Sequence, residues 1–306
     1  MTTTSPTPVQ RYRALLAGTT AYLRPLAWAS LISNMVLVVT GGAVRLTDSG
    51  LGCPTWPRCT DSALTPRNSL SIHSAIEFGN RMLTFVLVIV AVATLIAAWQ
   101  THRRELRRLS LGLMLGIPAQ AIIGGISVLT HLNPWIVSVH LLCSLAMICL
   151  AVLLVRLVDQ PGPLAAATAG APTTKLAWST FGAGWLVLYV GTVVTGSGPH
   201  AGDRHAHRNG LSPLQLAQLH ADLVFLFVGL TVGLIVLLVA TRARSEALRA
   251  AKVLLIVELA QGTIGFVQYF THLPIVLVGF HMLGAALVTA TMTWALLAAR
   301  EGRAAT

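Results

Sequence analysis

The chain has 306 residues, of which 55% are hydrophobic and only 10% are charged, and its formal net charge is +11. Soluble domains carry about 25% charged residues, so this composition excludes an ordinary soluble protein and indicates a surface that largely faces lipid. The positive charge follows the pattern expected beside a membrane, which is preferred here to nucleic-acid binding.

Eight apolar runs are long enough to cross about 30 Å of hydrocarbon as helices. They do not alternate between polar and apolar residues, as the strands of a transmembrane barrel would. We therefore predict an all-α integral membrane protein with eight transmembrane helices, at residues 26–45, 77–99, 109–129, 137–158, 178–197, 215–240, 251–270 and 276–299.

The basic residues predict the orientation of the chain. Of the 21 Lys and Arg residues, 15 fall on one side of the predicted membrane. That side is cytoplasmic by the positive-inside bias, which places both termini inside the cell and the protein in the cell membrane. The predicted organisation is a cytoplasmic leader at 1–25, a first half at 26–158, a cytoplasmic linker at 159–177 and a second half at 178–300.

The two halves share a repeated segment. Ala119–Leu142 aligns without a gap on Ala260–Leu283, at a constant offset of 141 residues, and His140 falls on His281. Four spans per half return the chain to its starting side, so the halves are parallel repeats. We predict two four-helix bundles related by a pseudo-two-fold axis along the membrane normal.

The cysteines fall into two pairs. Cys53 and Cys59 lie in LGCPTWPRC, in the first outer loop. A closely spaced pair on the oxidising side favours a disulfide bond, with two free thiols or a metal-binding pair as alternatives. Cys143 and Cys149, both in the fourth span, do not share a helical face and are interpreted as packing residues.

Histidines inside the membrane are expensive and usually functional. His140, His220 and His281 each stand near the outer start of a span, so they share one level, and Asn80 occupies the matching level in the second span. Two facing imidazoles in an apolar bundle suit an iron porphyrin. Glycines could leave a slot for this flat group, for example Gly124, Gly125, Gly229, Gly233, Gly265 and Gly284. The alternatives are interhelical hydrogen bonds, or a copper or zinc site, for which no third close ligand is evident.

Polar residues also gather at the start of the second span. His73, Glu77, Asn80 and Arg81 have spacings that put them on roughly one helical face. A carboxylate there is a candidate base, nucleophile or stabiliser of positive charge. The alternative is a structural ion pair between Glu77 and Arg81.

The remaining ionisable groups have simpler interpretations. Two of them, Asp222 and Glu258, are expected to make polar contacts between helices. His131 and His272, in matching outer turns, are expected to face solvent, with contact to a propionate or a donor as the alternative. We expect an ordinary polar loop around His200, His205 and His207, with weak metal affinity as the alternative.

An ordered set of motifs runs through both halves: VVTGGAVRLTDSGLGCPTWPRC, IEFGNR, AQAIIGG with SVHLL, TGSGPHAGD, QLH, and AQGTIG with GFHML. In this set the chain resembles the haem A synthase family. The resemblance implies two four-helix halves, a haem b bound by His220 and His281, and the substrate, haem O, near Glu77 and His140. It also implies oxidation of the C8 methyl of haem O to a formyl group by successive hydroxylation, after which the geminal diol loses water.

The resemblance extends to single positions. Glu77 matches the acidic residue of the family's second span, and the pair Cys53 and Cys59 matches cysteines that form a disulfide in one branch. Asn80 departs from the family, which has a histidine there. His140 is then expected to bind the substrate iron alone, or with help from His73.

The implied partners are haem O as substrate, a haem O synthase upstream and the cytochrome oxidase assembly machinery downstream, with no nucleic acid. Whether the chain forms a homo-oligomer is left open. Two other functions remain as alternatives: a di-haem electron-transfer protein without methyl oxidation, and a haem-handling transporter or assembly factor.

Overall fold

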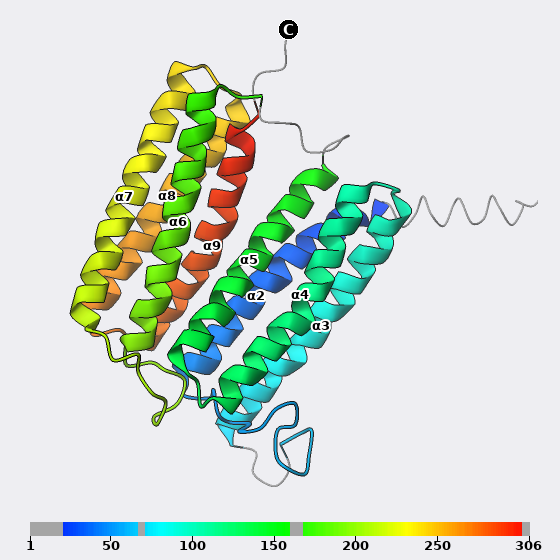
Figure 1. Cartoon of the computed structure of the whole chain (residues 1–306), viewed down its shortest axis with the longest axis vertical. Helices are drawn as coiled ribbons and strands as arrows, with labels where there is room; N and C mark the ends of the chain where they lie inside the picture. The colour runs from blue at the N-terminus through cyan, green and yellow to red at the C-terminus, as the bar shows by residue number, and fades with distance from the viewer. Residues whose placement is uncertain (1–20, 67–70, 160–167, 302–306) are drawn as a thin grey trace, which may run out of the picture.

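The computed structural model describes residues 21–66, 71–159 and 168–301. Within these residues all regular secondary structure is helical, with no strand (Figure 1). The eight long helices are α2 (Leu23–Leu46), α3 (Ile72–Gln100), α4 (Arg104–Leu129), α5 (Pro134–Val158), α6 (Ala171–Ser197), α7 (Pro213–Ala240), α8 (Ser245–Phe270) and α9 (Ile275–Ala299).

The helices form two groups that stand side by side (Figure 1). In the first, α2 packs on α3, α3 on α4, α4 on α5, and α5 back on α2. The second repeats this closed order with α6, α7, α8 and α9. Helices α2, α5, α6 and α9 make the contacts between the groups. This pairing is what a two-fold relation between the halves would give, and the axis itself stays a prediction.

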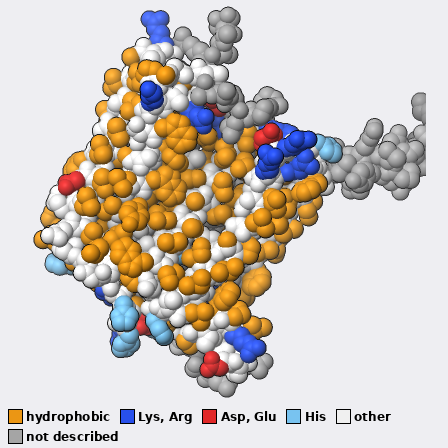
Figure 2. Space-filling model, viewed as in Figure 1, with side chains coloured by type: hydrophobic (Ala, Val, Ile, Leu, Met, Phe, Trp, Pro, Cys, Tyr) orange, Lys and Arg blue, Asp and Glu red, His pale blue; other side chains and the backbone are white. Residues whose placement is uncertain are grey.

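All eight helices are long and apolar enough to cross a membrane. Hydrophobic side chains cover the middle of the visible face, and most charged side chains lie toward its two ends (Figure 2). Large apolar side chains on the outer helices are exposed, among them Phe85, Ile89, Phe225 and Val236. Side chains of this kind are stable against lipid and not against water, so the chain is a multi-pass integral membrane protein, as predicted.

Helices α3, α4, α6 and α8 begin several residues before the predicted apolar runs, because their first turns contain polar residues. Helix α3 begins at Ile72, where the Ser71 side chain caps the helix by accepting from the Ser74 N–H at 3.1 Å. Helix α6 begins at Ala171 with a proline in its first turn, so residues 171–177 of the predicted linker are helical. Residues 1–20 of the predicted leader lie outside the described residues.

The turns between α4 and α5 and between α8 and α9 have matching backbone conformations. His131 and Leu132 have φ values of 52° and 60°, and their counterparts His272 and Leu273 have 62° and 59°. Left-handed conformations are uncommon outside glycine, so their recurrence at the same offset supports the structural equivalence of the two segments. Both turn histidines are exposed, as expected.

The two bundles are joined at the end that carries the loops between α2 and α3 and between α6 and α7, here called the long-loop end. The Arg45 guanidinium donates from Nε to the His200 carbonyl and from Nη2 to the Thr195 carbonyl, each at 2.6 Å. The N–H of Gly50 donates to the Gly202 carbonyl at 2.8 Å. A cation is favoured at the carboxyl end of α6, where carbonyls lack helical partners.

The opposite, arginine-rich end joins the bundles through an ion-pair network. Arg156 of α5 pairs with Glu246 of α8 and, at 2.9 Å, with Glu301 just after α9. Arg244 also pairs with Glu301. Residues from both halves therefore hold the two bundles together at each end of the molecule.

Candidate functional site

Three histidines lie at one level of the molecule. His140 on α5, His220 on α7 and His281 on α9 each stand about two helical turns from the start of their helix. All three helices begin at the long-loop end (Figure 1). The histidines are therefore at similar depth, as the sequence predicts.

The structure brings His220 and His281 together across the second bundle. Helices α7 and α9 occupy opposite corners, since each packs on α6 and α8. The two ring centroids are nevertheless 6.5 Å apart, with an angle of 70° between the ring planes. The imidazoles thus face each other across the interior of the bundle.

A glycine on a neighbouring helix makes room for each histidine ring. The distance from the ring carbon Cε1 to the place of an added glycine Cβ is too short for an ordinary contact at all three sites: 2.8 Å for His140 and Gly124, 3.0 Å for His220 and Gly191, and 3.2 Å for His281 and Gly265. We call Gly124, Gly191 and Gly265 glycine seats, because the absence of a side chain lets each histidine ring lie directly against the helix backbone. Gly124 and Gly265 were expected to leave a slot; Gly191 was missed.

Glutamines support the two histidines of the repeated segment. The Gln261 side chain donates to the His281 carbonyl at 2.7 Å, and the Gln120 side chain donates to the Ser144 hydroxyl at 2.7 Å and the His140 carbonyl at 3.4 Å. The sequence holds the signal for this role, because Ala-Gln opens both copies of the repeat.

Each of the three histidine rings has one buried nitrogen without a hydrogen-bond partner. Nδ1 of His140, His220 and His281 is buried without a hydrogen-bond partner. A buried polar group left unpaired costs about 1–3 kcal/mol, so helix packing alone gives no reason to keep three such rings. Their arrangement is more consistent with binding a ligand.

The first bundle differs from the second at the position that faces its histidine. Asn80 of α3 accepts a hydrogen bond from the Thr40 hydroxyl of α2 at 2.8 Å. The shared VVTG motif aligns α2 with α6 and puts Val36 where α6 has Gly191. The first bundle therefore has one histidine in a glycine seat, and at the position that corresponds to the second histidine it has an amide bonded to a hydroxyl.

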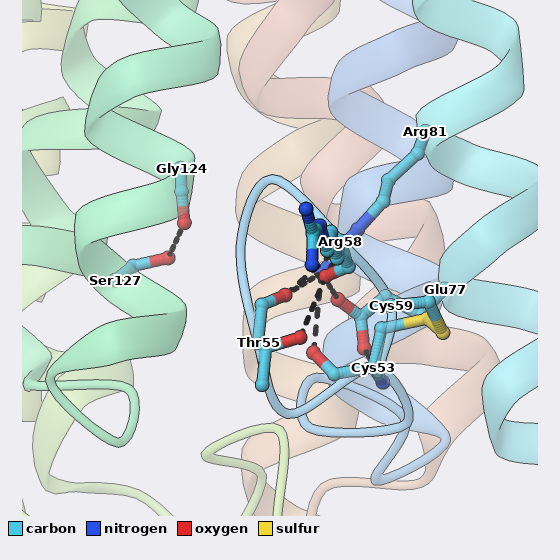
Figure 3. Close-up of polar contacts among 8 residues, drawn as sticks. All are labelled: Cys53, Thr55, Arg58, Cys59, Glu77, Arg81, Gly124 and Ser127. Atoms are coloured by element: carbon cyan, nitrogen blue, oxygen red, sulfur yellow. Dashed lines mark hydrogen bonds and ion pairs between the residues drawn. A yellow bond between two sulfur atoms is a disulfide. The ribbon is translucent and has the colours of Figure 1, made fainter. Parts of the chain in front are cut away.

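Glu77 ties α3 to the loop that the cysteines close (Figure 3). Cys53 and Cys59 form the predicted disulfide bond. The Glu77 side chain is buried, and its Oε2 accepts the Cys53 N–H at 2.6 Å, while its Oε1 pairs with Arg81 at 2.5 Å. The ion pair considered as the alternative is present. The contact with the loop could not be read from the sequence.

Arg81 binds the same loop. Its Nη2 donates to the carbonyl oxygens of Cys53, at 3.2 Å, and Thr55, at 3.3 Å. The guanidinium and the carboxylate of Glu77 thus hold the disulfide loop between α3 and α4, where Figure 3 shows it.

The other candidate histidines do not converge. His73 is exposed in the first turn of α3, with its Nδ1 3.1 Å from the Ser49 hydroxyl. His200 contacts the Leu273 carbonyl at 2.9 Å, and both His205 and His207 are exposed. In the part of the chain that the structure describes, no group of three or more His, Cys, Asp or Glu side chains could hold a metal ion.

Two acidic residues were expected to contact neighbouring helices. Glu258 of α8 does so, by accepting from the Thr231 hydroxyl of α7 at 2.7 Å. For Asp222 the expectation is wrong, because its carboxylate accepts from Gln218 of the same helix at 2.8 Å and is exposed. Cys149 of α5, which was interpreted as a packing residue, accepts a hydrogen bond from the Thr293 hydroxyl of α9 at 3.1 Å.

Comparison with known proteins identifies relatives of the chain. Residues 24–202 match the COX15-CtaA family, described as cytochrome oxidase assembly protein. The chain is 32% identical over 182 residues to the heme A synthase of Lysinibacillus sphaericus, which covers 56% of this chain and 58% of that protein. It is 29% identical over 180 residues to that of Staphylococcus haemolyticus, covering 56% and 59%.

A third relative, the heme A synthase of Geobacillus thermodenitrificans, is 34% identical over 114 residues, which is 36% of this chain and 34% of that protein. The chain thus spans less than two thirds of the length of these curated relatives. The family match, in contrast, takes in more than half of this chain, including the disulfide loop, Glu77 and His140. The protein therefore belongs to the COX15-CtaA family of cytochrome oxidase assembly proteins.

Proposed function

We propose that this protein is a haem A synthase, which oxidises the C8 methyl of haem O to a formyl group by successive hydroxylation. The observation that carries the proposal is the pair of facing imidazoles in the second bundle, beside a first bundle that keeps only one of them. Relatives that carry the name heme A synthase support this function.

In the second bundle, His220 and His281 would hold the iron of a haem b. An imidazole nitrogen lies about 2 Å from a metal that it binds, so two rings on one metal have centroids roughly 6 Å apart. The 6.5 Å separation here fits such a pair. When bound, this haem would supply one-electron transfer.

In the first bundle, His140 would position the substrate by binding its iron from one side. The opposite wall offers Asn80, whose amide oxygen is engaged by Thr40. We propose that Asn80 lines the substrate site without replacing the missing histidine. His73 stands in the first turn of α3 beside Ser49, which favours a role in anchoring the loop over iron binding.

Glu77 would assist the chemistry at the methyl carbon. A geminal diol becomes a formyl group when one hydroxyl loses its proton and the other leaves as water, and a positioned carboxylate can relay that proton. The same carboxylate can stabilise positive charge that develops on the substrate. The contacts of Glu77 with Arg81 and with the Cys53 N–H hold both of its carboxylate oxygens in place.

The orientation and partners complete the proposal. The arginine-rich end, where the four Arg residues at 103, 104, 107 and 108 lie, would face the cytoplasm of the cell membrane, with both termini on that side. Both histidine sites would then lie toward the outer leaflet. Haem O would come from a haem O synthase, and the product would pass to the assembly of cytochrome oxidase.

The test is to express the chain with a source of haem O and to identify the bound haems by mass and absorption spectrum. Haem A and a haem b are expected in the wild type, no haem b in a His281→Ala variant, and loss of haem A in Glu77→Gln. His272→Ala, in the exposed turn on the same side, is the matched control and should behave as wild type. Unchanged haem O conversion in Glu77→Gln would favour a di-haem electron-transfer protein.

A further inference from the structure

Trp56, in the middle of the disulfide loop, rests on α4 beside the seat of His140. A Cβ atom added to Gly125 would lie 2.6 Å from Cε2 and 2.7 Å from Cγ of the Trp56 indole. The preceding residue, Gly124, is the one that receives the His140 ring. Two adjacent glycines thus accept an imidazole from inside the bundle and an indole from the loop.

The loop presents Trp56 in a fixed position. The disulfide between Cys53 and Cys59 closes the loop around it, and both cysteines are almost fully buried. On the α3 side, Glu77 and Arg81 bind the loop backbone. Trp56 nevertheless keeps 36% of its surface exposed. A ring that is anchored by one face and uncovered on another is suited to contact a ligand.

The second bundle has no counterpart of this arrangement. The repeat aligns AQAIIGG with AQGTIGF, so Gly265 keeps the histidine seat while Phe266 replaces Gly125. Phe266 is 52% exposed, and residues 198–212, which join α6 to α7, contain no aromatic residue other than histidine. The Trp56 indole and the glycine on which it rests are therefore features of the first bundle alone, and not of the architecture that the two bundles share.

We propose that Trp56 is a positioning residue for a flat tetrapyrrole in the first bundle, where its indole forms the wall of the site next to His140 at the long-loop end. The inference rests on the proposed function, because it assigns the first bundle to the substrate. An aromatic wall suits a planar macrocycle, since offset ring contacts add to the burial of apolar surface.

The test is to measure KM and kcat for haem O together with the absorption spectrum of haem b. Trp56→Ala and Trp56→Leu are each expected to raise KM about tenfold with little change in kcat, as loss of one aromatic contact would. The haem b spectrum should not change, and Trp56→Phe should bring KM back to within about threefold of wild type. The matched control is Phe266→Ala, at the aligned position of the second bundle, which should leave KM unchanged.

Trp56→Leu keeps an apolar side chain against Gly125 and provides a folded comparison if the Ala variant is lost. A wild-type KM in Trp56→Leu overturns the inference while leaving the proposed function in place. A purely structural role is indicated if kcat and haem b content fall together and Phe does not restore KM, and that also overturns it. A wild-type chain that neither binds nor converts haem O overturns the proposed function and, with it, the inference.

Discussion

The proposed binding of haem b through His220 is expected to weaken when a single methyl group is added at Gly191. The added Cβ would lie 3.0 Å from Cε1 of His220, where ordinary contacts begin at 3.4 Å, so the ring or helix α6 must move by about 0.4 Å. The ring can yield while it is free, but not when its nitrogen is bound to iron. Overpacking costs about 1–3 kcal/mol, which corresponds to roughly 5- to 150-fold weaker binding.

The measurement is a titration of the purified apoprotein with haem b, followed by absorption and by melting temperature. Gly182→Ala is the control on the same helix, because a Cβ there meets nothing within 4 Å. It should bind haem b as wild type does. Gly265→Ala should show a smaller loss than Gly191→Ala, since its Cβ would lie 3.2 Å from the ring of His281. Wild-type affinity in Gly191→Ala would refute the role of this glycine as a seat for the ring.

Three further changes test contacts outside the histidine pair. Thr231→Val should lower the stability by about 1–3 kcal/mol, because the Glu258 carboxylate loses its hydrogen bond and its Oε2 already has no partner; an unchanged melting temperature in detergent would contradict this. Cys59→Ser should destabilise the protein by about 2 kcal/mol through the freed loop and increase its cleavage by protease, while haem b content stays the same. Arg156→Met should lower the stability of the protein because contacts with both Glu246 and Glu301 are lost. The expected loss lies between about 1 kcal/mol, as for an exposed ion pair, and about 3 kcal/mol, as for a buried one. It is measured by thermal unfolding, with Arg249→Met as the control, since Arg249 of α8 has no described ion pair.

The sequence predicted the number and order of the helices because membrane spans depend on a property that is local in the chain. A run of apolar residues must be about 20 residues long to cross the hydrocarbon, and each helix satisfies its own backbone. The helix ends were less well predicted, as at Ile72 and Ala171, because hydropathy does not detect a polar first turn fixed by a cap or a proline.

The repeat made the histidine level predictable as well. His140 and His281 follow their glycine seats at the same spacing, and that constant spacing was a signal for the role of Gly124 and Gly265. Not every glycine has such a role: a Cβ on Gly229 would meet nothing within 4 Å. Composition alone cannot separate a glycine that seats a ring from one that faces lipid.

Contacts made by loops were beyond prediction, because they join residues that are distant in the sequence. Nothing near Trp56 in the chain indicates that its indole lies on Gly125, and nothing near Arg45 indicates the carbonyl of His200. The wrong expectation for Asp222 has a related cause. A charged residue within a span was assumed to need a partner on another helix, whereas Gln218, one turn earlier, supplies the hydrogen bond.

The joining of the bundles at both ends limits how the molecule can move. A transporter that opens its binding site to each side of the membrane in turn does so largely by rocking one repeat against the other. Here such rocking would have to separate Arg45 from the carbonyls of Thr195 and His200 at one end, or Arg156 from Glu246 at the other. The halves are therefore joined as a rigid pair, in which the distance between the two histidine sites stays constant.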